Sequence, residues 1–139
     1  MTFPDVNYLA VLVSGVAIFV LGGLWYSPAL FAKKWMALIG KNEDELKAGS
    51  AGIMPMLYGL AFLCALATAW TLAVIQNHFD DLTILRATLL GGMCWFGFAG
   101  ATSFATALFS MKPKQLWLID SGYNLASFVM ASIILSLWR

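Results

Sequence analysis

The sequence predicts an all-α membrane protein, a bundle of four transmembrane helices with a short amphipathic helix at the membrane interface after the first span. Of its 139 residues, 61% are hydrophobic and only 11% are charged, whereas a soluble domain carries about 25% charged residues. The charges are also clustered, so that residues 6–32, 48–77 and 87–111 contain none and residues 115–138 contain only Asp120. Each range can hold the ~20 apolar residues that a helix needs to cross a bilayer. We therefore expect one integral membrane domain over residues 1–139.

The first span is predicted at about residues 6–26. It ends in Trp25 and Tyr26, and these two residue types are enriched at the headgroup level because they combine an apolar ring with a polar tip. This pair therefore marks the end of the first span at a membrane surface.

A surface helix is predicted at about residues 28–39. Ser27 can cap it, and Pro28 suits its first position because a missing N–H costs little there. Lys33 lies opposite its apolar face and Lys34 flanks that face, which is typical of a helix lying along a membrane surface.

Spans two and three are predicted at about residues 53–76 and 83–108, and each carries small residues at every fourth position. The alanine ladder of span two is Ala61, Ala65, Ala69 and Ala73, and the glycine–alanine ladder of span three is Gly97, Ala101 and Ala105. Small residues let transmembrane helices approach closely. We therefore predict that spans two and three pack as a tight hairpin.

Span four, at about residues 116–138, holds the strongest functional signal. Asp120, Tyr123, Asn124 and Ser127 follow one another at i, i+3, i+4 and i+7, so they share one face of a helix. A carboxylate within a span is costly and marks a functional or structural role. The sequence therefore predicts a polar stripe centred on Asp120.

Lysines and arginines predict the orientation. The loops at residues 27–52 and 109–115 carry the six lysines at positions 33, 34, 41, 47, 112 and 114, whereas the opposite side has only Arg86 and Arg139. Because positive charge accumulates on the cytoplasmic side, we expect these two loops in the cytoplasm and both termini outside.

Two stretches of the chain resemble a known family. The first is residues 21–35, which contain Leu-Gly-Gly-Leu-Trp-Tyr-Ser-Pro at 21–28 and Phe-Ala-Lys-Lys-Trp at 31–35. The second is Leu-Trp-Leu-Ile-Asp-Ser-Gly-Tyr-Asn at 116–124. Together they resemble the bacterial membrane family called domain of unknown function 1761. The resemblance implies a four-helix protein of the bacterial inner membrane. It supplies no activity and identifies no catalytic residues.

The predicted topology brings several polar side chains to one level of the bilayer. The candidate ligand-binding residues are Asp120, Tyr123, Asn124, Ser127, Tyr26, Tyr58, Ser103 and Thr106. Such a group could line a pocket for a small cation or solute. In the alternative interpretation, Asp120 pairs with Lys33 or Lys34 and latches the surface helix to the fold.

These observations favour a small transporter or solute-binding protein in the lipid bilayer. The alternative is a non-catalytic structural or partner-binding membrane protein. A net charge of +1 argues against a nucleic-acid partner, and we expect no catalytic site and no cofactor. His78, Asp80 and Asp81 lie in too short a turn for a metal site. Because four helices enclose little space, a transport pathway would form between the copies of a homodimer.

Overall fold

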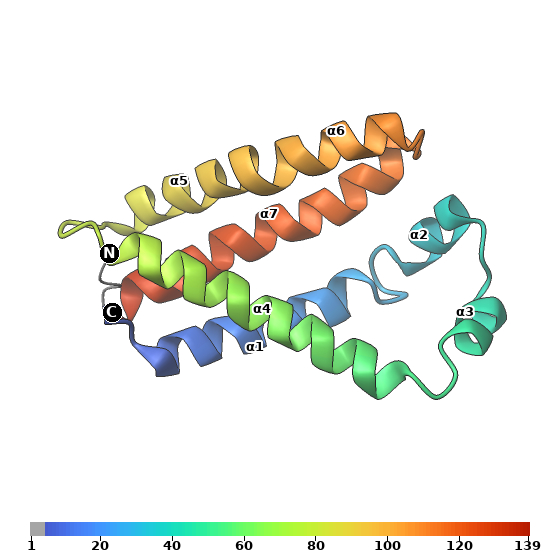
Figure 1. Cartoon of the computed structure of the whole chain (residues 1–139), viewed down its shortest axis with the longest axis horizontal. Helices are drawn as coiled ribbons and strands as arrows, with labels where there is room; N and C mark the ends of the chain where they lie inside the picture. The colour runs from blue at the N-terminus through green and yellow to red at the C-terminus, as the bar shows by residue number, and fades with distance from the viewer. Residues whose placement is uncertain (1–4) are drawn as a thin grey trace.

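The chain folds into helices throughout the part described by its computed structural model, residues 5–139 (Figure 1). The helices are α1 (Tyr8–Trp25), α2 (Ala32–Ile39), α3 (Glu43–Gly49), α4 (Met54–Gln76), α5 (Ile84–Cys94), the π-helix η1 (Trp95–Gly100), α6 (Ala101–Phe109) and α7 (Lys114–Leu137). Four segments, namely α1, α4, the continuous α5–η1–α6 and α7, are long and apolar enough to cross a membrane. The predicted fold class is confirmed. The first four residues of the predicted domain lie outside the described part.

The four long segments run alternately in opposite directions (Figure 1). Helix α1 begins and α7 ends at one end of the bundle, whereas α2, α3 and the turn between α6 and α7 lie at the other end. Helix α7 packs against α1, α4, α5 and η1, and it also contacts α2. The last span is therefore the central helix, and every other long segment is positioned against it.

The predicted hairpin of spans two and three is wrong. Helix α4 packs mainly on α1 and α7, and the third segment packs on α7, with no extensive contact between α4 and α5–η1–α6 in the described residues. The alanine ladder is buried at Ala65, Ala69 and Ala73, but the whole glycine–alanine ladder is exposed. The small residues of both ladders permit another helix to pack closely, but they do not specify which helix packs there.

Two other glycines mark where helices come closest. A Cβ atom on Gly15 of α1 would lie 2.6 Å from Cδ2 of Leu66 on α4. A Cβ atom on Gly91 of α5 would lie 2.8 Å from the carbonyl oxygen of Phe128 and 2.5 Å from Oγ of Ser132, both on α7. The bundle is therefore assembled from two close pairs, α1 with α4 and α5 with α7.

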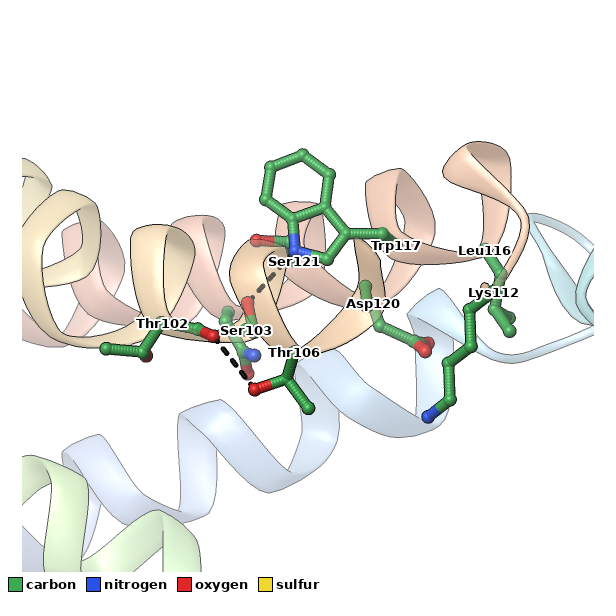
Figure 2. Close-up of a pocket in the computed structure, with 10 residues that line it drawn as sticks. Thr102, Ser103, Thr106, Lys112, Leu116, Trp117, Asp120 and Ser121 are labelled. Atoms are coloured by element: carbon green, nitrogen blue, oxygen red, sulfur yellow. Dashed lines mark hydrogen bonds between the residues drawn. The ribbon is translucent and has the colours of Figure 1, made fainter. Parts of the chain in front are cut away.

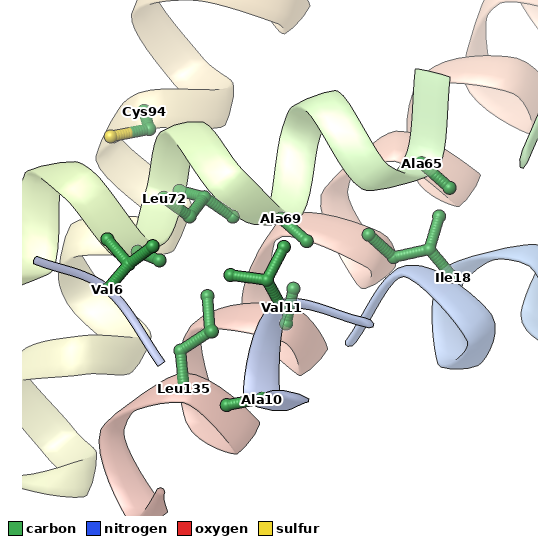
Figure 3. Packing of buried hydrophobic residues seen from close by; sticks show 11 residues of the cluster. Val6, Ala10, Val11, Ile18, Ala65, Ala69, Leu72, Cys94 and Leu135 are labelled. Carbon is green, nitrogen blue, oxygen red and sulfur yellow. The ribbon is translucent and has the colours of Figure 1, made fainter. Parts of the chain in front are cut away.

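The core lies between α1, α4 and α7, and its side chains are mostly small (Figure 3). Its buried members are Val6, Ala10, Val11, Ile18, Ala65, Ala69, Leu72, Ala73, Cys94, Ala131 and Leu135. Larger apolar side chains cover the outside of the bundle, where Phe98 is 75% exposed and Met93 is 70% exposed. This inversion of size is expected where lipid, not water, surrounds the helices.

The surface helix begins later than predicted. Helix α2 starts at Ala32, not Pro28, because Ser27 does not cap it. The hydroxyl of Ser27 donates instead to the carbonyl oxygen of Leu24, at 2.7 Å, and so satisfies the end of α1. Gly40 ends α2 with a φ of 72°, as its position predicts.

Candidate functional site

The carboxylate of Asp120 is held by a tyrosine. The hydroxyl of Tyr26, one residue beyond α1, donates to Oδ1 of Asp120 at 2.6 Å. Burial, and next the hydrogen bond to Asp120, raise the pKa of the Tyr26 hydroxyl above its ordinary value. The tyrosine therefore stays protonated and remains the donor.

The predicted latch between Asp120 and Lys33 or Lys34 is not formed. Among residues 5–139 the ion pair lies within α3, and both lysines are exposed on α2. The reason is geometric. Residues 27–31 form turns, so α2 starts only at Ala32. Tyr26, at the end of α1, makes the hydrogen bond to the carboxylate instead.

Two tryptophans bind the backbone on either side of Asp120. The indole Nε1 of Trp25 donates to the carbonyl oxygen of Ile119 at 3.0 Å, and that of Trp95 donates to the carbonyl oxygen of Ser121 at 3.1 Å. Three consecutive residues of α7 therefore accept hydrogen bonds from aromatic side chains of other elements. The backbone around Asp120 is held from two directions, by α1 and by η1.

The π-helix positions Trp95, and nothing in the sequence pattern revealed it. The Trp95 ring lies against Gly100, five residues further along, where an added Cβ atom would be 3.0 Å from the ring. A π-helical turn shifts the following residues around the helix axis relative to an α-helix, and such turns are frequent at functional sites. Here the π-helix and Gly100 together leave room for the indole that binds Ser121.

A pocket of about 370 Å³ lies between α6 and the first turns of α7 (Figure 2). Its lining residues are Thr102, Ser103, Thr106, Ala107, Lys112, Leu116, Trp117, Asp120, Ser121 and Asn124. It unites four of the eight predicted ligand-binding residues, namely Asp120, Asn124, Ser103 and Thr106. Asp120 also borders a second cavity of about 390 Å³ beneath α2, so this residue lines both cavities.

The other four predicted residues do not line this pocket, although Tyr26 donates to Asp120 and borders the second cavity with it. Tyr26, Tyr58 and Tyr123 line a separate cavity of about 380 Å³ among α1, α4 and α7. Tyr58 is 56% exposed there, and the hydroxyl of Tyr123 donates to the carbonyl oxygen of Ile18 at 3.1 Å. Ser127 is buried and donates to the carbonyl oxygen of Tyr123 at 2.8 Å, so it is occupied within α7.

The α6 hydroxyl groups that line the pocket are available to a ligand as hydrogen-bond acceptors, because each already donates its hydrogen to a backbone oxygen. Thr102 donates to the carbonyl oxygen of Phe98 in η1 at 2.7 Å, and Thr106 donates to that of Thr102 in α6 at 3.1 Å. Ser103 donates to the carbonyl oxygen of Gly100 at 3.2 Å and accepts from Nε1 of Trp117 at 3.0 Å. The α6 side of the pocket therefore offers acceptors, which suit a cation or an N–H donor.

Two polar side chains of α7 face the pocket without partners. Ser121 is 3% exposed, and its Oγ has no hydrogen-bond partner in the described part of the chain. The Asn124 amide is half-buried, and no hydrogen bond to it occurs within residues 5–139. Buried polar groups are normally satisfied. The Ser121 Oγ is enclosed by the protein, so the Asn124 amide is the group of this pair that a ligand in the pocket can bind.

Sequence reasoning missed Lys112 as a member of the site. Its charge contributes to the predicted orientation, and its side chain lines the same pocket as Asp120. The signal that could have found it is Lys-Pro at residues 112–113, directly before the helix that carries Asp120. A residue before proline is confined to extended backbone, which makes the position of such a lysine well defined.

Fold and site together define an all-α protein with four helical segments long and apolar enough to cross a membrane, in which polar side chains converge beside the first turns of the last of these segments. The two stretches with family resemblance contact each other there, through Trp25 with Ile119 and Tyr26 with Asp120. The model of a family described as protein of unknown function (DUF1761) matches residues 9–136, so the chain belongs to this family. No curated protein and no solved structure matches the chain.

Proposed function

We propose that this protein binds a small polar solute carrying a positively charged group, and that Asp120 receives this group. The observation that carries the proposal is the state of the carboxylate. Its Oδ1 accepts the Tyr26 hydroxyl, whereas no residue of the described chain donates to Oδ2 or forms an ion pair with it. A half-buried carboxylate in an apolar bundle is costly without a positive partner, and the adjoining pocket offers room for one.

The biological role that fits this site is solute transport across the bacterial inner membrane. The pocket lies at the end of the bundle that holds the α6–α7 turn, and the loops at residues 27–52 and 109–115 carry six lysines. We place these loops in the cytoplasm and both termini outside, by the positive-inside rule. The solute would then enter or leave the pocket on the cytoplasmic side.

We further propose that the protein works as a homodimer. Each pocket is small, and the core between α1, α4 and α7 is closed by small side chains (Figure 3). A pathway through the membrane would therefore form between two copies, and a two-fold arrangement is the commonest closed assembly. Cross-linking in native membranes at a single added cysteine, in a form in which the native Cys64 and Cys94 are replaced, tests this arrangement, because a monomer would give no dimer band.

A second candidate function is structural, and the aromatic hydrogen bonds support it. Tyr26, Trp25 and Trp95 bind three successive residues of α7. In this non-catalytic function Asp120 is one of the attachment points that hold α1 to α7. The latch partner is then Tyr26, in place of the lysines expected from the sequence.

One experiment separates the two functions. The purified protein is heated in detergent with simple amines such as ethanolamine, with alkali cations or with lipids, because a ligand that binds the folded state raises the melting temperature by mass action. Asp120→Asn removes the charge but keeps an oxygen that can accept the Tyr26 hydroxyl. Tyr26→Phe removes the hydroxyl but keeps the charge.

The binding function predicts that amines stabilise the wild type and Tyr26→Phe, and do not stabilise Asp120→Asn. The structural function predicts that no compound stabilises any form and that Tyr26→Phe alone lowers the melting temperature. Amine stabilisation that survives in Asp120→Asn would refute a role for the carboxylate in binding.

A further inference from the structure

The pocket beside α7 contains one acidic and one basic side chain that do not pair. Lys112, in the turn between α6 and α7, lines the same cavity as Asp120. Figure 2 shows its side chain reaching toward the end of the pocket where the Asp120 carboxylate lies, with Thr102 and Ser103 toward the other end. The ion pair within residues 5–139 is confined to α3, so Lys112 and Asp120 do not form a salt bridge with each other. Both remain open to a ligand.

The backbone around Lys112 is held in an unusual conformation. Met111 has a φ of 55°, the one positive φ among the described non-glycine residues. Its side chain is 90% exposed and packs on little. The turn is closed by the N–H of Lys112, which donates to the carbonyl oxygen of Ala107 at 3.1 Å, and Pro113 then restricts Lys112 to extended backbone. The left-handed backbone conformation is sterically unfavourable for a residue other than glycine. Here Met111 adopts this conformation in the turn that places Lys112 beside the pocket.

The neutral part of the pocket suits a short ligand. Its volume of about 370 Å³ is near the lower end of the range of roughly 300–1,000 Å³ for small-molecule sites. The Asn124 amide, which has no hydrogen-bond partner within residues 5–139, lines the same pocket and offers hydrogen bonds to a polar ligand. Ala107, Leu116 and Trp117 supply the apolar part of the lining, and the small volume limits the length of any hydrocarbon chain within the pocket.

We propose that the pocket selects a zwitterion, a molecule with an ammonium group and an anionic group only a few bonds apart. The ammonium group binds Asp120 and the anionic group binds Lys112. This inference rests on the proposed function, in which Asp120 receives the positive group, and adds the requirement for the negative one. The shared chemistry occurs both in a free amino acid-like solute and in the headgroup of phosphatidylethanolamine.

Binding is measured by titration calorimetry of the purified protein in nanodiscs of phosphatidylcholine. Ethanolamine supplies an ammonium group alone, whereas β-alanine and phosphoethanolamine add a carboxylate or a phosphate. Lys112→Gln removes the basic group. Lys114→Gln is the matched control, because Lys114 is the first residue of α7 and does not line the pocket.

We expect the wild type and Lys114→Gln to bind at least one zwitterion about 10-fold more tightly than ethanolamine, the gain typical of one added charge-assisted contact. Lys112→Gln should bind the zwitterion and ethanolamine with about equal affinity. Repeating the titration in phosphatidylethanolamine nanodiscs identifies the source, because a lipid headgroup in the pocket would compete with the soluble zwitterion and a free solute would not be displaced.

Equal affinity of the wild type for ethanolamine and both zwitterions would overturn this inference while leaving the proposed function intact. If Lys114→Gln lowers the affinity for the zwitterion as much as Lys112→Gln does, this inference is also overturned and the proposed function stays intact. Ethanolamine binding that does not depend on Asp120 would instead refute the proposed function itself.

Discussion

The hydrogen bond between Tyr26 and Asp120 gives a stability prediction of calculable size. Tyr26→Phe removes only the hydroxyl that donates to the carboxylate at 2.6 Å. The ring of Tyr26 makes edge contacts with Trp35 and Tyr123, each with ring centroids 5.7 Å apart, and phenylalanine can keep both. The loss is therefore that of one charge-assisted hydrogen bond, with little change in packing.

Such a bond contributes roughly 1.5–3 kcal/mol when its partner is charged. Asp120 is only half-buried, so water can partly replace the lost donor. We therefore expect Tyr26→Phe to lower the free energy of unfolding by about 1–2 kcal/mol. The same pair should show a coupling energy of similar size in a double-mutant cycle with Asp120→Ala.

The assay is reversible unfolding of the four forms of the cycle in mixed detergent micelles, followed by circular dichroism. Asp120→Asn is the control, because its amide oxygen can still accept from Tyr26 and should keep part of the coupling. Coupling within about 0.5 kcal/mol of zero, the usual error of additivity, would refute the view that this bond attaches α1 to α7.

Three further predictions concern backbone positions, with unfolding free energy as the measurement. Gly91→Ala should lower the unfolding free energy by about 1–3 kcal/mol through overpacking, since its Cβ atom would lie 2.5 Å from a serine hydroxyl on α7. The neighbouring Gly92→Ala is the control and should leave the unfolding free energy unchanged, because its Cβ atom would have nothing within 4 Å. Equal effects of the two substitutions would contradict the close pairing of α5 with α7. Gly100→Ala should cost about 1–2 kcal/mol and alter the fluorescence of Trp95, whose ring would lie 3.0 Å away; an unchanged spectrum would argue against the π-helical arrangement. Met111→Gly should stabilise by up to about 1 kcal/mol, because its φ is 55°; destabilisation would show that the methionine side chain contributes to the turn.

The family resemblance was predictable because it rests on local signatures. Trp-Tyr-Ser-Pro at residues 25–28 and Asp-Ser-Gly-Tyr at 120–123 can be recognised without knowing their spatial relation. The structure then explains why both occur in one chain, since Tyr26 donates to Asp120. The contact joins residues 94 positions apart, and no helical or strand spacing predicts a pair at that separation.

The candidate site was predictable in part. The shared face of Asp120 and Asn124 follows from helical spacing, and both line the pocket. Tyr123 and Ser127 share the spacing but bind backbone oxygens of α1 and α7 instead. Periodicity indicates which residues share a face, and only the neighbouring helices determine whether that face meets a cavity or another backbone.

The sequence by itself determined that this is an all-α protein with four helices able to span a membrane, and that one carboxylate lies within the last of them. Hydropathy and helix spacing are local properties, so they can be read along the chain. The tertiary structure decided which helices pair, that Tyr26 holds Asp120, and that a π-helix aims Trp95 at α7. In lipid every face of a span is apolar, so close packing and polar contacts select the partners, and these depend on the whole bundle.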